Sequence, residues 1–445
     1  MKNKKQVLDL FRQNNDYITD RVNAGIDVNR KGYCNVLLKN EAGEPVKNAK
    51  VSVVLKKHEF MFGARMGDYS TDKGYEDSFK ELFNGATIPL NWDDIEKEEG
   101  KADYTEFDKC LDFCEKNGIE SRLQALASQD HLPLWLKEKS IEESKKAYTK
   151  RLEELGKKYS SKIRTVEALR GIFGCDKNAE FYNHNDYVDY CLDETSRLMS
   201  PNHIAMNELT HIWYDGLHTA RDPYYMKLGM LLRKGKNIDA IGMEYRLLLD
   251  AREEFIKSMR FHMFVGWWPQ EEEDYRKTLD PVHIFNTLDK YTDFGLPIQL
   301  TGVMVPALSS DAEDEEIQAE LLKYLYSMWF SHSKVEQIIY WNLVDGFENE
   351  GAEKSDKYFG GLLRSDMSKK PAYYVLDELI NKEWQTREEL VTDEDGVIRF
   401  KGFYGDYELE IEADGKKYTK ALSHSKDYPT TLSPMFGRKY KKITL

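Results

Sequence analysis

The sequence predicts an α/β protein, a (β/α)8 TIM barrel accompanied by a small β-sandwich. Between residues 59 and 383, apolar strand-like runs alternate with amphipathic helical segments, and eight such units suit a (β/α)8 barrel. The two ends of the chain instead show the alternating pattern of half-buried strands. The length of 445 residues accommodates one large barrel and one small module.

The ends of the chain predict the small module. Residues 1–24 carry apolar residues among polar ones and predict a helix. Residues 32–57 alternate on both sides of a Gly-Glu-Pro turn, and the tail from about Glu389 repeats the pattern around two Asp-Gly turns. Neither stretch alone can bury a core, so we expect them to pair. The expected domains are 1–58, 59–383 and 384–445.

The barrel strands are predicted from short apolar runs. Each run precedes an amphipathic segment, as a parallel strand precedes its crossover helix. The predicted strands are Phe60–Gly63, Gly85–Leu90, Glu120–Ala127, Thr165–Leu169, His203–Asn207, Ala240–Tyr245, Ile298–Val303 and Gln337–Leu343.

The charge balance excludes some classes of function. Lys and Arg total 64 and Asp and Glu total 78, so the net charge is −14 and a nucleic-acid partner is not expected. No apolar run reaches the length of a membrane span, so we expect no membrane partner. Residues 1–11 lack the apolar core of a signal peptide, which favours a cytoplasmic protein unless a leader was removed. We also expect a monomer.

The residues that commonly hold metals or cofactors show no matching pattern. The five cysteines are too few and too irregular for a disulfide framework, and we expect them to be small buried side chains. The ten histidines lack metal-ligand spacing, and no glycine-rich phosphate loop follows a strand. We therefore expect no metal and no cofactor.

Several passages, taken in chain order, carry a resemblance to a known family. They are FMFGA at 60–64, NWDDIEKEEGKADYTEFD from Asn91, RLQALASQDHLPLW at 122–135, IDAIGMEYR at 238–246, LPIQLTG at 296–302, and IIYWNLVDG with GGLLRSDMSKKPAYYVL. These passages resemble glycoside hydrolase family 10, the endo-β-1,4-xylanase family. The resemblance covers about residues 59–380. It implies a (β/α)8 barrel with its site at the carboxyl ends of the strands.

The same resemblance implies that both catalytic positions have changed. A retaining glycosidase needs one carboxyl group as acid/base and a second as nucleophile. The family's acid/base glutamate corresponds to Gly171, the asparagine before it to Arg170, and the nucleophilic glutamate to Gly302. Glycine fills neither role, so we predict that the chain does not hydrolyse xylan at a useful rate.

The sugar-binding residues have changed in the same way. By the resemblance, the family's histidine and tryptophan of the third strand correspond to Gln124 and Ser128, and the lysine before Trp92 to Asn91. The glutamine and histidine of the sixth strand correspond to Glu244 and Arg246. Small or apolar side chains are predicted to line the altered site together with Trp341: Leu169, Gly171, Leu209, Met243, Gly302 and Met304. Such walls are typical of a pocket for a small non-sugar ligand.

This reasoning leads to a first hypothesis of general-base chemistry. Glu244 would abstract a proton from carbon, as in the Kemp elimination of a benzisoxazole, with Arg246 or Arg170 holding the anion. Trp341 or Trp92 would stack on the aromatic substrate. Changes concentrated in the site of an otherwise family-like scaffold favour deliberate redesign of a natural barrel.

Other interpretations stay open. The chain is alternatively an inactive or weak xylanase homologue that binds xylo-oligosaccharides through Trp92, Trp135 and Trp341. A third hypothesis is an active glycosidase with displaced carboxylates such as Glu208 and Glu244. Glu244 and Arg246 also fit an inert salt bridge, and Arg170 a pair with Glu167 or Glu208.

Overall fold

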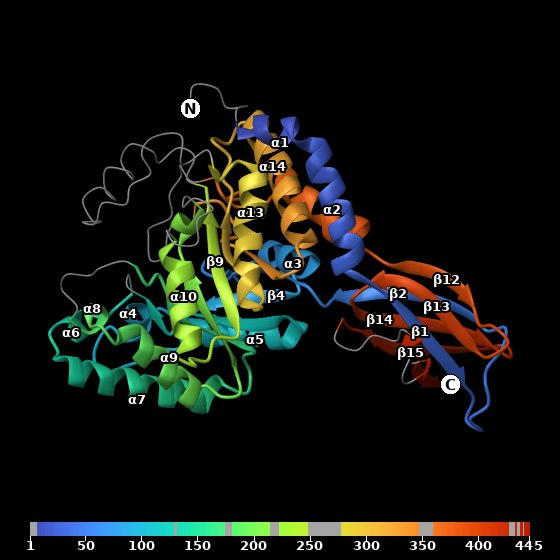
Figure 1. The fold of residues 1–445 in the computed structure, drawn as a ribbon, viewed down its shortest axis with the longest axis horizontal. Coiled ribbons are helices and arrows are strands. Elements are labelled where there is room, and N and C mark those ends of the chain that lie inside the picture. The colour runs from blue at the N-terminus through green and yellow to red at the C-terminus, as the bar shows by residue number, and fades with distance from the viewer. Residues whose placement is uncertain are drawn as a thin grey trace. The chain divides into compact units, whose positions relative to one another are not determined.

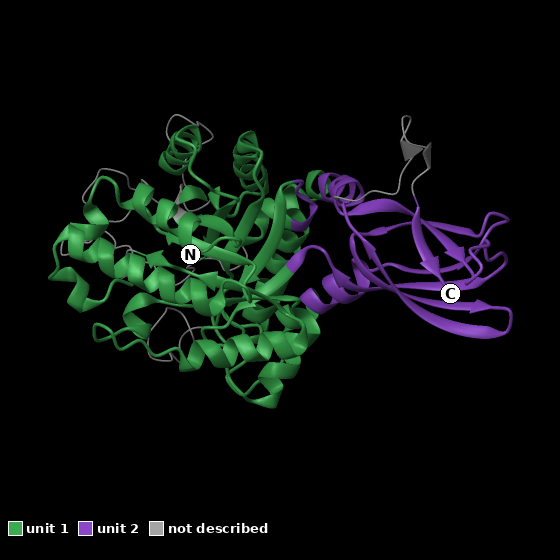
Figure 2. Cartoon of the chain, turned by 90° about the horizontal axis from the view of Figure 1, so that it is seen from below, with its two compact units in different colours: residues 1–18, 62–329, 334–375 green, residues 19–61, 330–333, 376–445 purple. Residues whose placement is uncertain are grey.

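A computed structural model of the chain describes residues 7–128, 131–173, 180–213, 222–247, 277–346, 359–426, 432–433, 437–438 and 440–445 (Figure 1). The chain divides into two compact units, coloured separately in Figure 2. Unit 1 comprises residues 1–18, 62–329 and 334–375, and unit 2 comprises residues 19–61, 330–333 and 376–445.

Unit 1 is built around a closed barrel of eight parallel strands, which confirms the predicted fold class. The sheet order is β5-β4-β3-β11-β10-β9-β8-β7, and pairing of β5 with β7 closes it. A short additional strand, β6 (Ala127–Ser128), pairs with the end of β7. The eight strands are β3 (Met61–Arg65), β4 (Gly85–Pro89), β5 (Glu120–Gln124), β7 (Thr165–Arg170), β8 (His203–Glu208), β9 (Ala240–Arg246), β10 (Ile298–Met304) and β11 (Val335–Tyr340). All eight overlap the predicted strands, although their ends differ from the predicted ones.

Helices follow the barrel strands, and local signals mark their beginnings. The longer ones are α3 (Lys73–Leu82), α5 (Thr105–Asn117), α7 (Ile141–Tyr159), α9 (Tyr187–Leu198), α10 (Pro223–Arg233), α13 (Pro281–Tyr291), α14 (Ala312–Ser331) and α15 (Pro371–Glu378). Helix α7 begins with a capping box between Ser140 and Glu143. Helices α10 and α13 each begin with a proline after a capping aspartate, because proline lacks only an N–H that a first turn leaves unpaired. Short helices are α4 (Trp92–Ile95), α6 (Leu134–Lys137), α8 (Glu180–Asn183), η2 (Thr210–Trp213) and η4 (Thr292–Phe294).

Unit 2 joins strands from both ends of the chain, as predicted. Strand β1 (Lys31–Lys39) pairs antiparallel with β13 (Val397–Phe403) and parallel with β18 (Lys441–Thr444). Strand β2 (Lys50–His58) lies between β12 (Arg387–Val391) and β14 (Gly405–Ala413), and β15 (Lys416–His424) completes that sheet. The rings of Phe400 and Tyr407, one from each sheet, lie 5.4 Å apart. A segment η5 (Leu379–Glu383) precedes β12.

The N-terminal segment differs from the prediction in two respects. The helix predicted over 1–24 is two helices, α1 (Asp9–Gln13) and α2 (Asn15–Asn29). Residues 1–18 also group with the barrel, whereas the predicted boundary assigned 1–58 to the small module. The reason is packing: the Phe11 ring lies 5.4 Å from that of Tyr324 in α14.

Two further expectations concern the described residues. Cys34, Cys110, Cys114 and Cys191 are buried as predicted, and Cys175 lies outside the described residues. In the ranges that the structure describes, no helix has both the length and the apolar character that a bilayer span requires.

Candidate functional site

The candidate site lies at the carboxyl ends of the barrel strands, which we call the mouth. Glu244 on β9 is at its centre, and its side chain is 1% exposed. Arg170, at the end of β7, donates from Nε to Glu244 Oε1 at 2.6 Å and from a terminal nitrogen to Oε2 at 3.4 Å. Arg246, two residues along β9 and on the same face, places Nε 3.0 Å from Glu244 Oε2. The Glu244 carboxylate therefore forms ion pairs with the guanidinium groups of both Arg170 and Arg246.

A network of buried polar side chains is hydrogen-bonded to the Glu244 carboxylate. Asn207 on β8 donates to Glu244 Oε1 at 3.3 Å and to Glu167 Oε1 at 3.1 Å, and it accepts a hydrogen bond from Thr301 at 2.6 Å. Glu167 accepts from Arg122 at 2.8 Å, and both side chains are fully buried. Burial raises the pKa of Glu167, and the Arg122 guanidinium opposes that rise. Such a network holds Glu244 in one orientation because each member is bonded to the next.

Trp341 lies directly after β11, where three guanidinium groups contact its ring. The guanidinium carbons of Arg246, Arg65 and Arg170 lie 3.4, 4.4 and 5.7 Å from the ring centroid. We call Arg65, Arg170 and Arg246 the arginine cluster. The Trp341 ring, predicted to stack on a substrate, is 1% exposed and instead forms cation–π contacts with arginines.

Glu208 is the last residue of β8, and its carboxyl group is hydrogen-bonded to backbone N–H groups. Its two oxygens accept hydrogen bonds from the N–H groups of Ile172 at 2.8 Å and Leu209 at 2.9 Å. Complete burial raises the pKa of Glu208 to about 8, although both N–H groups act in the opposite direction. The carboxyl is therefore mostly protonated at neutral pH.

Gly171 and Gly302, which the resemblance predicted to stand at the family's glutamate positions, have local reasons to be glycine. Gly171 has φ = 66°, a left-handed conformation that side-chain-bearing residues rarely adopt. A Cβ at Gly302 would lie 3.1 Å from the Trp341 ring and 3.3 Å from Cγ of Glu244. Trp341 and Glu244 thus occupy the space that a side chain at 302 would need.

The other predicted site residues are divided between the mouth and the barrel core. Gln124 and Ser128 are buried, and Gln124 Oε1 accepts a hydrogen bond from Arg65 at 3.0 Å. Asn91 donates to Asp94, and Trp92 is buried and donates to Glu96, so neither serves as an exposed platform. Among the apolar residues predicted to line the site, Leu169, Met243 and Met304 are buried, and Leu209 is half-buried.

Arg65 was missed by the sequence reasoning. It ends β3, the first barrel strand, directly after the apolar run Met61–Ala64. A charged residue at the carboxyl end of a barrel strand was the available signal, because functional side chains of this fold come from those ends.

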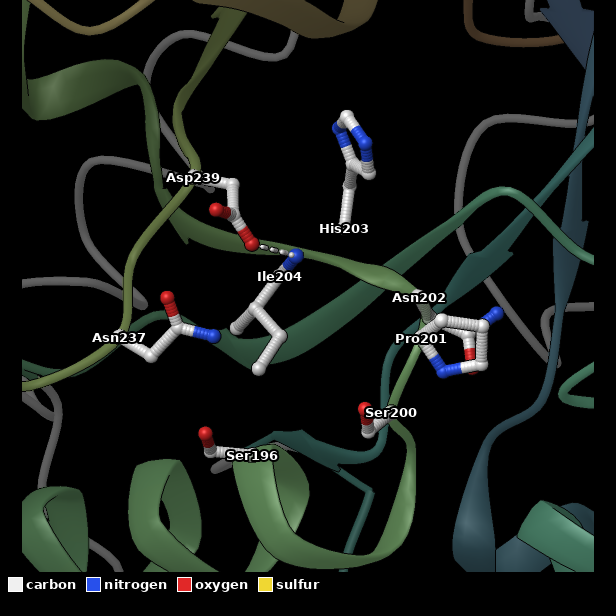
Figure 3. A pocket seen from close by; sticks show the side chains of 8 residues that line it. All are labelled: Ser196, Ser200, Pro201, Asn202, His203, Ile204, Asn237 and Asp239. Atoms are coloured by element: carbon white, nitrogen blue, oxygen red, sulfur yellow. Dashed lines mark hydrogen bonds between the residues drawn. The ribbon is translucent and has the colours of Figure 1, made fainter.

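Two other features of the described residues do not form a competing site. A polar hollow of about 320 Å³ lies at the amino end of β8, lined by residues such as Asn202, His203 and Asp239 (Figure 3). This end of a (β/α)8 barrel serves stability. Asp93, Asp94 and His131 place possible ligand atoms within 4.8 Å of one another, but His131 Nδ1 already lies 3.1 Å from Asp93 Oδ1.

The fold is a (β/α)8 barrel, and the polar cluster lies at the carboxyl ends of its strands. A family model described as glycosyl hydrolase family 10 matches residues 52–267 and supports the resemblance to that family. Native xylanase 10B from Thermotoga maritima has a similar fold, with a TM-score of 0.57, 17% identity, and coverage of 73% of this chain and 96% of that one. Xylanase 10B from Thermotoga petrophila in complex with xylobiose gives a TM-score of 0.56, also at 17% identity, covering 73% and 95%.

Curated relatives match over most of the chain. Anti-sigma-I factor RsgI6 from Acetivibrio thermocellus is 24% identical over 421 residues, which is 91% of this chain and 48% of that protein. Endo-1,4-beta-xylanase 2 from Arabidopsis thaliana is 23% identical over 407 residues, 88% of this chain and 33% of that protein. The chain therefore spans less than half the length of either relative.

Proposed function

We propose that this chain is a xylanase-like barrel that binds β-1,4-linked xylo-oligosaccharides without hydrolysing them. The observation that carries the proposal is that the Glu244 carboxylate at the mouth is engaged in ion pairs with Arg170 and Arg246. The family resemblance of the barrel supplies the ligand class.

The state of the described carboxyl groups opposes hydrolysis. A retaining glycosidase needs two carboxyl groups about 5–5.5 Å apart, one to transfer protons and one to attack the sugar. At the described mouth, Glu244 contacts two guanidinium groups and both Glu208 oxygens accept backbone N–H groups. By the resemblance, Gly171 and Gly302 correspond to the family's two glutamates.

The comparisons support a sugar ligand and a role other than degradation. The similar solved barrels are xylanases, and one of them is titled as a complex with xylobiose. A curated relative that matches 91% of this chain is named as an anti-sigma factor. The chain therefore resembles part of a protein that is named as a regulator, and it also resembles proteins that are named as xylanases.

General-base chemistry at Glu244 is the weaker candidate. If Glu244 abstracted a proton from carbon, its carboxylate would give up ion pairs with both Arg170 and Arg246. The Trp341 ring, the expected platform for an aromatic substrate, contacts guanidinium groups and is buried. No comparison points to Kemp elimination or to a redesigned site.

Isothermal titration calorimetry with xylohexaose tests the binding, and release of reducing ends from the same sugar tests the chemistry. We expect saturable binding, no detectable cleavage, and weaker binding of cellohexaose, the matched glucose oligomer. Absence of xylohexaose binding, or cleavage that Glu244→Gln abolishes, would contradict the proposal. A benzisoxazole assay of the same two proteins would reinstate the general-base hypothesis if turnover were lost in the variant.

A further inference from the structure

The polar hollow at the amino end of β8 lies at the opposite end of the barrel strands from the mouth. Its volume of about 320 Å³ far exceeds the roughly 10–15 Å³ that one water molecule needs, so it has room for a ligand of several non-hydrogen atoms. Most of its lining is polar, and the lining residues are Ser196, Ser200, Pro201, Asn202, His203, Ile204, Asn237 and Asp239. Such a lining favours a ligand that forms hydrogen bonds.

Asn202 provides a buried acceptor in this hollow. The residue directly precedes β8 and is 7% exposed. Its amide nitrogen donates to the backbone oxygen of Ser160 at 2.9 Å and to that of Ile163. Because a carbonyl only accepts, these two bonds identify the nitrogen, and the remaining side-chain atom is the oxygen. That oxygen is buried and has no hydrogen-bond partner among the described residues, a cost that an N–H group of a ligand would remove.

Asp239 adds a negative charge to the same hollow. One of its oxygens, Oδ2, accepts the backbone N–H of Ile204 at 2.8 Å, as Figure 3 shows, and a carboxylate has capacity for further donors. In the ranges that the structure describes, Asp239 forms no ion pair. Lys236, which precedes it in the same loop, pairs instead with Asp193 at 2.7 Å and with Asp189 at 3.4 Å.

A cation that carries N–H groups satisfies both features. An ammonium group has three N–H donors, a guanidinium group has five, and neither accepts a hydrogen bond. Hydrogen bonds from such a group to a carboxylate are stronger than those between neutral partners. A neutral sugar could donate a hydroxyl to Asn202, but it carries no charge to balance Asp239.

We propose that this hollow binds a small organic cation through an ammonium or guanidinium group, with Asp239 as its ion-pair partner and Asn202 Oδ1 as a second acceptor. Figure 3 shows the side chains of Ser196 and Asn237 around the same hollow, where they supply further hydrogen-bonding groups. The site is separate from the mouth, so it does not depend on xylo-oligosaccharide binding. A free amine and an arginine side chain of a partner protein both carry the required group.

Isothermal titration calorimetry with agmatine tests the site, because agmatine carries a guanidinium group at one end and an ammonium group at the other. The matched control ligand is fully methylated putrescine, which has the same spacer and the same two charges but no N–H donor. We expect saturable binding of agmatine and about 10-fold weaker binding of the control, or less. N-acetyl-arginine methylamide distinguishes the sources. Its binding more tightly than agmatine would support a partner's side chain, and the reverse would support a free amine.

Two variants sharpen the test. Asp239→Asn removes the charge but keeps an oxygen that can accept from the Ile204 N–H, and it should weaken agmatine binding about 10-fold or more. Asp193→Asn is the matched control. It removes the same charge from α9, where Asp193 pairs with Lys236 and does not line the hollow, and it should change the affinity by less than about 2-fold.

Circular dichroism checks the fold of both variants. If Asp239→Asn failed to fold, Ser196→Ala at the edge of the hollow would replace it, with an expected loss in agmatine affinity of about 3-fold. A rise in the urea midpoint of the unmodified chain with agmatine concentration provides a second readout of binding.

Three outcomes would overturn the inference. The first is absence of agmatine binding, or equal binding of its methylated control, because the N–H donors would then not matter. The second is an equal loss of affinity in Asp239→Asn and Asp193→Asn, because general charge would then explain it. The third is displacement of agmatine by xylohexaose, which would place the cation at the mouth.

Discussion

The Glu244 cluster predicts a large loss of stability when its carboxylate is removed. Glu244→Gln leaves the guanidinium groups of Arg170 and Arg246 without their shared negative charge while keeping the size of the side chain. Glu244 and Arg170 are 1% and 6% exposed, so water does not compensate the loss. Removing one partner of a buried ion pair costs about 3–5 kcal/mol, and we expect a loss of about 3 kcal/mol or more in the free energy of unfolding.

A surface pair of the same chemistry provides the matched control. Arg12 donates to both oxygens of Glu320, at 2.8 and 2.6 Å, in the same two-bond arrangement. Its side chains are 50% and 36% exposed, so Glu320→Gln should cost less than about 1 kcal/mol. The two variants therefore differ in burial and in the second guanidinium group, Arg246, that Glu244 contacts.

Urea unfolding followed by tryptophan fluorescence measures both variants, with the free energy taken by linear extrapolation. If Glu244→Gln cost no more than Glu320→Gln, the reasoning would be refuted, because burial would then not govern the strength of the pair.

Four other predictions concern Glu208, Gly302 and the C-terminal strands. Glu208 keeps its proton in the folded state up to about pH 8 but loses it earlier in the unfolded chain, so the free energy of unfolding should fall as pH rises. Between about pH 6.5 and 8, above the ordinary titration of histidine, Glu208→Gln should flatten that fall in pH-dependent urea titrations, and an unchanged slope would assign it to another group. Gly302→Ala places a Cβ 3.1 Å from the Trp341 ring and should lower the urea midpoint by an equivalent of about 1–3 kcal/mol. Gly302→Glu should release no reducing ends from xylohexaose, and cleavage by it would contradict our account of the mouth. A chain ending at residue 383 loses the partners of β1 and β2, so its exposed strand edges should drive aggregation on size-exclusion chromatography, and a monodisperse product would contradict this.

The barrel and its small partner module could be predicted because their signal is local. Each barrel strand is a short apolar run such as 298–304, buried along its whole length, and the runs recur with helices between them. In unit 2, β14 alternates between buried and exposed positions, as a strand with one covered face must. Burial leaves this periodic trace in the order of residues, so the fold class followed from the sequence.

The pairing of charges at the mouth could not be predicted in the same way. The sequence suggested that Glu244 and Arg246 share a face, because they are two residues apart on one strand. The sequence suggested either Glu167 or Glu208 as the partner of Arg170. In the structure Arg170 instead pairs with Glu244, which is 74 residues away along the chain. The sequence reasoning also missed Arg65, which reaches Trp341 from the other end of the barrel sequence.

The physical reason is that strand order and side-chain direction, rather than spacing along the chain, decide which charges meet. Closing the barrel brings the ends of β3, β7, β9 and β11 to one mouth, where side chains far apart in sequence compete for a single carboxylate. The apolar pattern determined where the strands are. Only the tertiary structure decided that Glu244 is shared by two arginines and that Trp341 is covered by them.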